Sequence, residues 1–339
     1  MIKRKEFPFD ITAVGEILID FTESGVSAGG NPLYEANAGG APANVAAAAA
    51  KLGSKTAFIG ATGTDRFGVL LRRALEACGT DTSGMQSAAH RHTTLAFVSL
   101  GEGGERQFSF CRNPGADTAF SIDGPVAALV SGSRFLHVGS LSLTEEPARS
   151  STFTAVAEAK RSGGFVSYDP NWREALWPSL QAGLEAMRSL LPYADVVKVS
   201  ESELTLLTGA APDPAGLSRG AAALLEHGAR LVCVTLGARG AFYKTAAWEG
   251  LVPVPPYPVP VVDTTGAGDA FTGALLHRLA ARLRNRCDDG CFLPETAAEL
   301  EADLAFANAA ASLCVTKRGA IPAAPDGAAV SRFLGTGAV

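Results

Sequence analysis

Aromatic and charged residues are both scarce in this sequence of 339 residues. Phe, Trp and Tyr make up 7% of the chain and the charged types 19%, against 47% apolar residues. The formal net charge of −5 offers no basic surface for nucleic acid or an anionic membrane, so we expect neither as a partner. Because stacking surfaces are few, a small polyhydroxylated ligand suits the chain better than a nucleoside base.

Cysteine and histidine are too scattered to suggest a ligand set. The six cysteines lack a disulfide-framework spacing, so we expect free thiols of a reducing compartment. Cys287 and Cys291 lie beside Asp288, but no second Cys or His pair is near, which argues against zinc. The five histidines form no metal-binding motif and are expected in the core or in solvent.

Long apolar runs free of charge or proline are also missing. Residues 1–5 are basic, but Glu6, Asp10 and Glu16 interrupt the apolar residues after them, so no secretory segment forms. The apolar run 251–262 contains five prolines, which excludes a membrane helix. These features predict a cytoplasmic protein.

One Gly-rich turn stands out among the features that are present. Residues 263–269 read Asp-Thr-Thr-Gly-Ala-Gly-Asp, and a helical apolar face comes directly after them. That face consists of Phe271, Leu275, Leu279 and Leu283. Unpaired N–H groups at such a helix start, freed of Cβ atoms by glycine, favour an anion such as phosphate. Asp269 is then either a plain helix cap or a general base that deprotonates an acceptor hydroxyl.

The rest of the chain alternates strand and helix patterns. A strand is expected over Ile11–Phe21, and Gly39–Asn44 opens an Ala-rich helix that ends near Gly53. From Arg134 onward strands and helices alternate, which is typical of a doubly wound, mostly parallel sheet. The expected elements are strands over 135–138, 165–168, 194–199 and 231–235, and helices over 144–161, 215–227 and 295–314.

Two β-rich runs interrupt this rhythm. Residues 93–100 and 107–111 flank the Gly-rich tip 101–106 and predict a hairpin. With the extended piece 21–37 they could form a small sheet that projects from the core.

Polar residues come after several of the predicted strands. Asp169 to Arg173, Lys198 to Glu203 and Thr235 to Gly240 all stand at strand ends, where open α/β sheets bind ligands. Each segment alone could equally be a structural turn.

Two segments resemble signatures of the ribokinase-like (PfkB) carbohydrate and nucleoside kinases. The turn 263–269 resembles the C-terminal signature of this family, and 39–68 is similar to the N-terminal one, through Gly39, Gly40, Asn44 and Asp65 among others. The resemblance spans about residues 11–325. It implies an α/β, ribokinase-like three-layer α/β/α core over 1–20, 38–92 and 118–339, with a small β-sheet lid over 21–37 and 93–117.

The resemblance also implies the site residues. The catalytic set is Asp269 as general base, the amides of Gly266, Ala267 and Gly268 as an anion hole, and Arg173 near the phosphate path. Asp269 would also contact the sugar, together with Asp20, Gly39, Gly40, Asn44 and Arg112. The nucleotide would meet Lys198, Glu203, Thr235, Gly237, Gly240, Gly268 and Asn308.

Two ions are implied beside ATP. Glu203 would organise Mg²⁺ through water, although Ser200 stands where the family usually has Asn. A K⁺ site would involve Asp263 and Thr265 with the carbonyls of Val315, Arg318 and Gly319. Ala323 replaces a serine ligand of some relatives.

The implied activity is transfer of the γ-phosphoryl group of ATP to a sugar. The run from Arg112 to Asp117 is similar to fructokinase-like members, so the 6-hydroxyl of fructose is the expected acceptor. A ketodeoxygluconate kinase or another ribokinase-like sugar kinase is the alternative, because Arg112 could bind a substrate carboxylate. A catalytically silent sugar-binding relative is a third interpretation. The lid could also serve as a homodimer contact.

Overall fold

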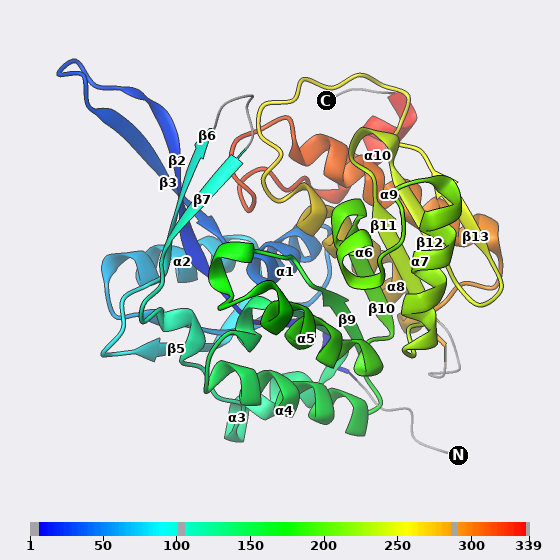
Figure 1. Cartoon of the computed structure of the whole chain (residues 1–339), viewed down its shortest axis with the longest axis horizontal. Helices are drawn as coiled ribbons and strands as arrows, with labels where there is room; N and C mark the ends of the chain where they lie inside the picture. The colour runs from blue at the N-terminus through cyan, green and yellow to red at the C-terminus, as the bar shows by residue number, and fades with distance from the viewer. Residues whose placement is uncertain (1–6, 101–105, 286–290, 337–339) are drawn as a thin grey trace.

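The strands of the computed structural model form two sheets. It describes residues 7–100, 106–285 and 291–336, within which one sheet has nine strands and the other four (Figure 1). The order in the large sheet is β13-β12-β11-β10-β9-β8-β1-β4-β5. Its strands are β1 Phe9–Val14, β4 Thr56–Gly63, β5 Asp81–Ala88, β8 Ser133–Gly139, β9 Phe165–Asp169, β10 Val196–Ser200, β11 Leu231–Thr235, β12 Ala241–Lys244 and β13 Glu249–Val252.

The large sheet is parallel from β5 to β11, and β12 and β13 continue it antiparallel. Parallel neighbours need crossover connections, which the helices provide. The helices are α1 Ala41–Lys51, α2 Arg66–Ala77, α3 Gly124–Ser131, α4 Ala148–Arg161, α5 Leu180–Leu190, α6 Glu201–Thr208, α7 Pro214–Glu226, α8 Ala267–Asn285, α9 Ala297–Cys314 and α10 Gly327–Thr336.

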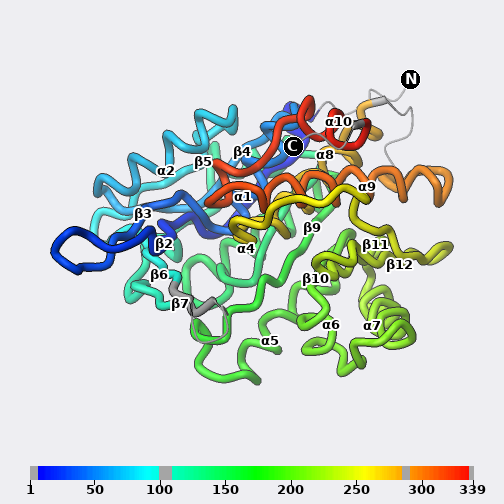
Figure 2. The backbone as a smooth tube through the Cα atoms, turned by 90° about the horizontal axis from the view of Figure 1, so that it is seen from above, coloured from blue at the N-terminus to red at the C-terminus, as the bar shows by residue number. Residues whose placement is uncertain are grey.

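Helices cover both faces of this sheet, which gives the predicted three layers. On one face Ile11 and Phe135 pack with α1, α8, α9 and α10, and on the other Val14 and Val138 pack with α4 to α7. Figure 2 shows α1 and α9 on the opposite side of the strands from α5, α6 and α7. Helix α4 begins at Ala148, later than predicted, with Pro147 at its N-cap. The predicted three-layer α/β/α architecture is confirmed.

The small sheet is the predicted projection. Its order is β3-β2-β6-β7, formed by β2 Leu18–Val26, β3 Pro32–Gly39, β6 Leu95–Leu100 and β7 Arg106–Cys111. The predicted hairpin is confirmed by the antiparallel pairing of β6 with β7, and its tip at 101–105 lies outside the described residues. Strands β2 and β3 extend away from the core in Figure 1. The residue boundaries between core and lid remain a prediction.

The single strand expected over Ile11–Phe21 is wrong, because the chain changes sheets within it. Strand β1 ends at Val14 in the large sheet and β2 begins at Leu18 in the small one. Gly15 makes the turn with φ of 147°, and a Cβ there would lie 2.8 Å from the Pro42 ring. Alternation of apolar residues continues through both strands, so the pattern conceals the break. As a result Glu16 lies in the connection and Asp20 lies in β2 of the small sheet.

Helix α8 buries the face that the sequence predicted. Phe271, Leu275, Leu279 and Leu283 are each at most 2% exposed and pack against α1 and α9. Burying each such side chain contributes roughly 1.5–3 kcal/mol to stability. This packing fixes the position of the Gly-rich turn at the start of α8.

Five cysteines in the described part of the chain have free thiols, at positions 78, 111, 233, 291 and 314. Cys287 and Asp288, the neighbours of Cys291 at which zinc is not expected, lie outside the described residues. Within the described ranges, no helix combines the length and apolar character needed to cross a bilayer.

Candidate active site

A polar cavity of about 310 Å³ opens where the small sheet meets the unit built on the large sheet. Strand ends and helix starts surround it, as expected for a ligand site in an open α/β sheet. Its lining residues are Glu16, Leu18, Asp20, Gly40, Ala41, Asn44, Phe110, Leu141, Asn171, Arg173, Lys198, Thr264, Thr265, Gly266, Gly268 and Asp269. The volume suits a small polar molecule.

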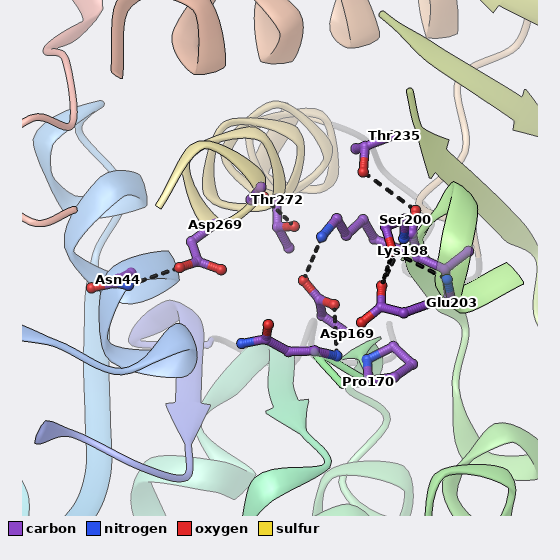
Figure 3. Close-up of polar contacts among 12 residues, drawn as sticks. Asn44, Asp169, Pro170, Lys198, Ser200, Glu203, Thr235, Asp269 and Thr272 are labelled. Carbon is purple, nitrogen blue, oxygen red and sulfur yellow. Dashed lines mark hydrogen bonds and ion pairs between the residues drawn. The ribbon is translucent and has the colours of Figure 1, made fainter. Parts of the chain in front are cut away.

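Asp269 lies in the first turn of α8 and faces this cavity. Its Oδ2 accepts a hydrogen bond of 2.7 Å from Nδ2 of Asn44 on α1 (Figure 3). The two helices approach closely because a Cβ at Gly273 would lie 2.8 Å from the Val45 carbonyl oxygen. Burial raises the pKa of Asp269 above the usual aspartate range, and Asn44, Lys198 and Arg173 offset this only in part. Asp269 is therefore a better proton acceptor than an exposed carboxylate.

The Gly-rich turn places backbone N–H groups beside Asp269. Gly266 has φ of 77°, and a Cβ there would lie 2.8 Å from Cα of Ala320, so only glycine fits. The Ala267 amide already donates to the Thr264 carbonyl at 3.3 Å. Gly268 occupies the helix turn in which amides lack intrahelical acceptors. Of the predicted anion-hole residues, Gly266 and Gly268 line the polar cavity and Ala267 does not.

Lys198 brings a buried positive charge to the same place. Its Nζ lies 2.9 Å from Oδ2 of Asp169, and a Cβ at Gly268 would also be 2.9 Å from Nζ. Burial raises the pKa of Asp169 to about 6 against the opposing effect of Lys198. Although burial disfavours the ammonium, Asp169 and Glu203 hold the pKa of Lys198 above its usual value. Lys198, expected to meet the nucleotide, thus lines the polar cavity beside the Gly-rich turn.

The two predicted arginines differ in position. Arg173 lines the cavity, and its Nη1 donates to the Trp172 carbonyl at 2.8 Å. Arg112 is buried outside the cavity lining and pairs with Asp117 at 2.6 Å. It also donates to Thr144 Oγ1 at 2.8 Å and to the Leu141 carbonyl at 3.0 Å.

The other predicted sugar residues cluster at the cavity. Asp20, Gly40 and Asn44 line it. Gly39 lies behind Asp20, because a Cβ at Gly39 would collide with the Asp20 carboxylate.

A second, more apolar cavity of about 510 Å³ adjoins the first. Thr264 and Gly268 line both, so the start of α8 separates the two. The predicted nucleotide residues Thr235, Gly237, Gly240, Gly268 and Asn308 all line it. Asn308 donates to the carbonyls of Val252 and Pro253 at 2.8 and 3.2 Å, which holds the segment after β13 against the cavity. Apolar walls with few polar groups suit a planar base.

Glu203 is held by backbone N–H groups. Its Oε1 accepts from the Trp172 amide and its Oε2 from the Ser200 amide, both at 2.7 Å. Although burial opposes it, Lys198 and these amides hold the pKa of Glu203 below its usual value. Ser200 caps α6 in a capping box with Glu203, so serine serves the helix start here. Glu203 is not one of the residues that line the polar or the apolar cavity.

The residues predicted around K⁺ belong to two neighbouring segments. Asp263 accepts from the amides of Thr265 and Gly319 at 2.8 and 3.0 Å, which ties 263–266 to the loop after α9. The Val315 carbonyl accepts from the amides of Val262 and Asp263. Arg318 lies in the same loop and is exposed.

Sequence reasoning missed some residues of the site. Glu16 lines the polar cavity, and Tyr257 and Val259 line the apolar one. A carboxylate directly after a glycine at the end of a buried strand was the available signal for Glu16. The proline-rich segment around Tyr257 served only to exclude a membrane helix.

These features define a small-molecule phosphotransferase of the carbohydrate kinase class. The family described as pfkB family carbohydrate kinase matches residues 9–327, so the chain belongs to that family. It is 42% identical over 328 residues to probable fructokinase-5 of Arabidopsis thaliana, covering 96% of this chain and 97% of that one.

Solved structures agree with this family. The fructokinase of Xylella fastidiosa with bound ATP is 33% identical, with a TM-score of 0.83 and coverage of 97% of this chain and 99% of that one. A double mutant of the fructokinase of Vibrio cholerae O395 was solved with fructose, ADP and potassium ion bound. It is 34% identical, with a TM-score of 0.82 and coverage of 98% and 100%.

Proposed function

We propose that the chain is a fructokinase that transfers the γ-phosphoryl group of ATP to the 6-hydroxyl of fructose. This proposal rests on one observation. Two cavities adjoin at the start of α8, and the polar one is lined by Asp269 while the other is mostly apolar. A sugar in the first and a nucleotide in the second would place hydroxyl and phosphate on either side of Gly268. The similarity to fructokinases over nearly the whole chain supports fructose as the acceptor.

The proposed mechanism begins with proton transfer to Asp269. Asn44 holds one carboxylate oxygen of Asp269, which orients the other toward the acceptor hydroxyl. As the hydroxyl attacks the γ-phosphorus, the bond to the leaving ADP oxygen breaks. Negative charge on the transferred group meets the Gly268 amide and the cations of Lys198 and Arg173. Asp20 and Gly40 would orient the remaining hydroxyls of the sugar.

Two ions complete the proposal. Glu203 would hold Mg²⁺ through water and not directly, because its oxygens already accept hydrogen bonds from amides and it lines neither cavity. When bound, Mg²⁺ would neutralise phosphate charge. Asp263, Thr265, Val315, Arg318 and Gly319 would hold K⁺ behind the anion hole, supported by the way Asp263 ties the two segments together.

Acid sugars are the less suitable acceptors. The guanidinium of Arg112 is already paired with Asp117 and bonded to Thr144 and Leu141. A substrate carboxylate would have to displace these buried partners, which favours fructose over ketodeoxygluconate.

We also propose a cytoplasmic homodimer that associates through the lid. Val26, Leu33 and Tyr34 are exposed apolar residues of β2 and β3, at 64%, 46% and 42% exposure. Their burial between two lids would remove this apolar surface from water.

A sugar panel tests the proposed substrate. With saturating magnesium ATP, fructose should give the highest kcat/KM among fructose, ribose, glucose and ketodeoxygluconate, measured by ADP release. A site built around several hydroxyls rejects sugars that misplace one. A tenfold advantage of ribose or ketodeoxygluconate, about 1.4 kcal/mol of barrier, would reassign the substrate and leave the kinase standing. No turnover with any sugar would support a silent sugar-binding relative.

Potassium should stimulate the reaction. An ion behind Asp263 would tune the Gly-rich turn without touching the sugar, so kcat should rise with K⁺ at constant ionic strength. Asp263→Asn should remove most of that stimulation. Equal rates with and without K⁺ in the unmodified protein would contradict the coupling.

A further inference from the structure

Glu16 is a buried carboxyl group at the cavity whose role the proposed mechanism leaves open. It lies between β1 and β2, is 2% exposed and lines the polar cavity. Its Oε1 accepts a hydrogen bond of 3.1 Å from the amide of Ala41, the first residue of α1. The chain at Glu16 also passes directly beneath Gly40, because a Cβ at Gly40 would lie 2.8 Å from Cα of Ile17. Glu16 therefore supports the Gly-rich start of α1.

The second oxygen of Glu16 lacks a partner. Oε2 is buried and finds no hydrogen bond in the described part of the chain. The same holds for Oδ1 of Asn44, which also lines the cavity. Leaving buried acceptors unsatisfied costs free energy, and such groups in folded proteins call for an explanation. Two of them at one cavity point to a ligand that supplies hydrogen-bond donors.

The chemistry of these atoms selects the ligand. Phosphate oxygens are acceptors and would repel both groups, whereas a sugar hydroxyl donates an O–H to either. Burial, with a smaller contribution from Asp117, raises the pKa of Glu16 to about 7, while Arg112 opposes the rise. A hydroxyl that donates to Oε2 would stabilise the ionised carboxylate, which is the form that burial disfavours.

We propose that Glu16 is a sugar-binding residue that determines acceptor specificity. Its Oε1 holds the Ala41 amide, and its Oε2 accepts a hydrogen bond from a hydroxyl of the acceptor other than the one phosphorylated. The phosphorylated hydroxyl gives its proton to Asp269, so it cannot be the donor to Glu16. This inference rests on the proposed sugar kinase function.

Glu16→Gln is the discriminating substitution, because it keeps an oxygen for Ala41 and replaces the other acceptor with an NH₂ donor. We expect the KM of the best sugar in the panel to rise about 10-fold or more, as for a lost hydrogen bond to a charged group. The kcat and the KM for ATP should change less than about threefold, and the melting temperature should equal that of the unmodified protein. Glu23→Gln, the same change at an exposed position of β2, is the control and should have no effect.

Monodeoxy analogues of the same sugar complete the test. For the analogue that lacks the hydroxyl bound by Glu16, the unmodified protein and Glu16→Gln should have the same KM, because neither can form that bond. An unchanged KM for the parent sugar would overturn the proposal. A penalty that persists for every analogue would also overturn it, because Glu16 would then act only by supporting Ala41.

Two further arms keep the test decisive. If Glu16→Gln does not fold, Glu16→Met is compared across the same sugars. The Ala41 amide also loses its partner in that variant, and this loss affects every sugar alike. The proposal then predicts a smaller KM penalty for the analogue that lacks the hydroxyl bound by Glu16, and equal penalties for all sugars would overturn it. If no sugar is phosphorylated, the proposed function fails, and calorimetric binding of fructose and its deoxy analogues to both proteins decides the role of Glu16 separately.

Discussion

Asp269→Asn should lower kcat by about 10²–10⁴-fold while fructose and ATP still bind. Asparagine cannot accept the hydroxyl proton, but its side-chain oxygen can still accept the hydrogen bond from Asn44, so the local geometry should persist. Calorimetry should give sugar and nucleotide affinities close to those of the unmodified protein. Asp326→Asn, an exposed aspartate at the start of α10, is the matched control and should retain full activity. A variant that keeps more than about half of the original kcat would remove Asp269 from the role of base.

The pH profile offers an independent check of the same role. Asp269 must be ionised to accept a proton, and burial raises its pKa. The kcat at saturating sugar, where protonation of Glu16 affects mainly KM, should therefore fall as the pH drops through that raised pKa, above the range in which an exposed aspartate titrates. In Asp269→Asn this acidic decline in the residual rate should disappear.

Lys198→Met should lower kcat by about 10²–10³-fold, the loss typical of one missing donor to a developing charge. The ammonium lies close to Gly268, where the transferred group would carry its charge. The substitution also leaves Asp169 buried without its partner, and breaking such a pair costs about 3–5 kcal/mol of stability. Activity and thermal unfolding must therefore be measured together.

The double variant Lys198→Met/Asp169→Asn separates the two effects. It removes both buried charges, so much of the lost stability should return while the activity should not. Recovery of kcat to near its original value would mean that Lys198 only neutralises Asp169. Lys244→Met, at a half-buried lysine on β12 away from both cavities, controls for the loss of one cation.

Hydrophobic periodicity predicted single helices and strands better than it predicted the contacts between them. The apolar face of α8 follows from its own sequence, and its four residues are buried as expected. The contact between Asn44 and Asp269 joins positions 225 residues apart and depends on the close approach at Gly273, which no local pattern encodes. The alternation through Ile11–Phe21 likewise describes two strands in different sheets. Local patterns report which face of an element is buried, but they do not report its neighbour.

The ion pair between Arg112 and Asp117 is a second feature that the sequence analysis did not predict. Arg112 and Asp117 are only five residues apart, and their ion pair was open to prediction from that spacing. The resemblance of the run from Arg112 to Asp117 to fructokinase-like members implies that Arg112 contacts the substrate, and that role stays a prediction. Glu16 comes directly after Gly15 at the end of a buried strand and belongs to neither segment that resembles a family signature, so its place at the polar cavity was not predicted.

The contact between α1 and α8 also bears on how the chain folds during synthesis. All strands of the large sheet precede α8, so the sheet can assemble on the ribosome before α8 and α9 emerge. Until then the face that carries Ile11, Phe135, Val196 and Leu231 has only α1 available, because α8, α9 and α10, which also cover it in the finished protein, are not yet synthesised. Such surface makes a nascent chain aggregation-prone and a client for chaperones. A chain released before α8 could not bring Asp269 to Asn44, so the hydrogen bond between them forms only when translation has passed both segments.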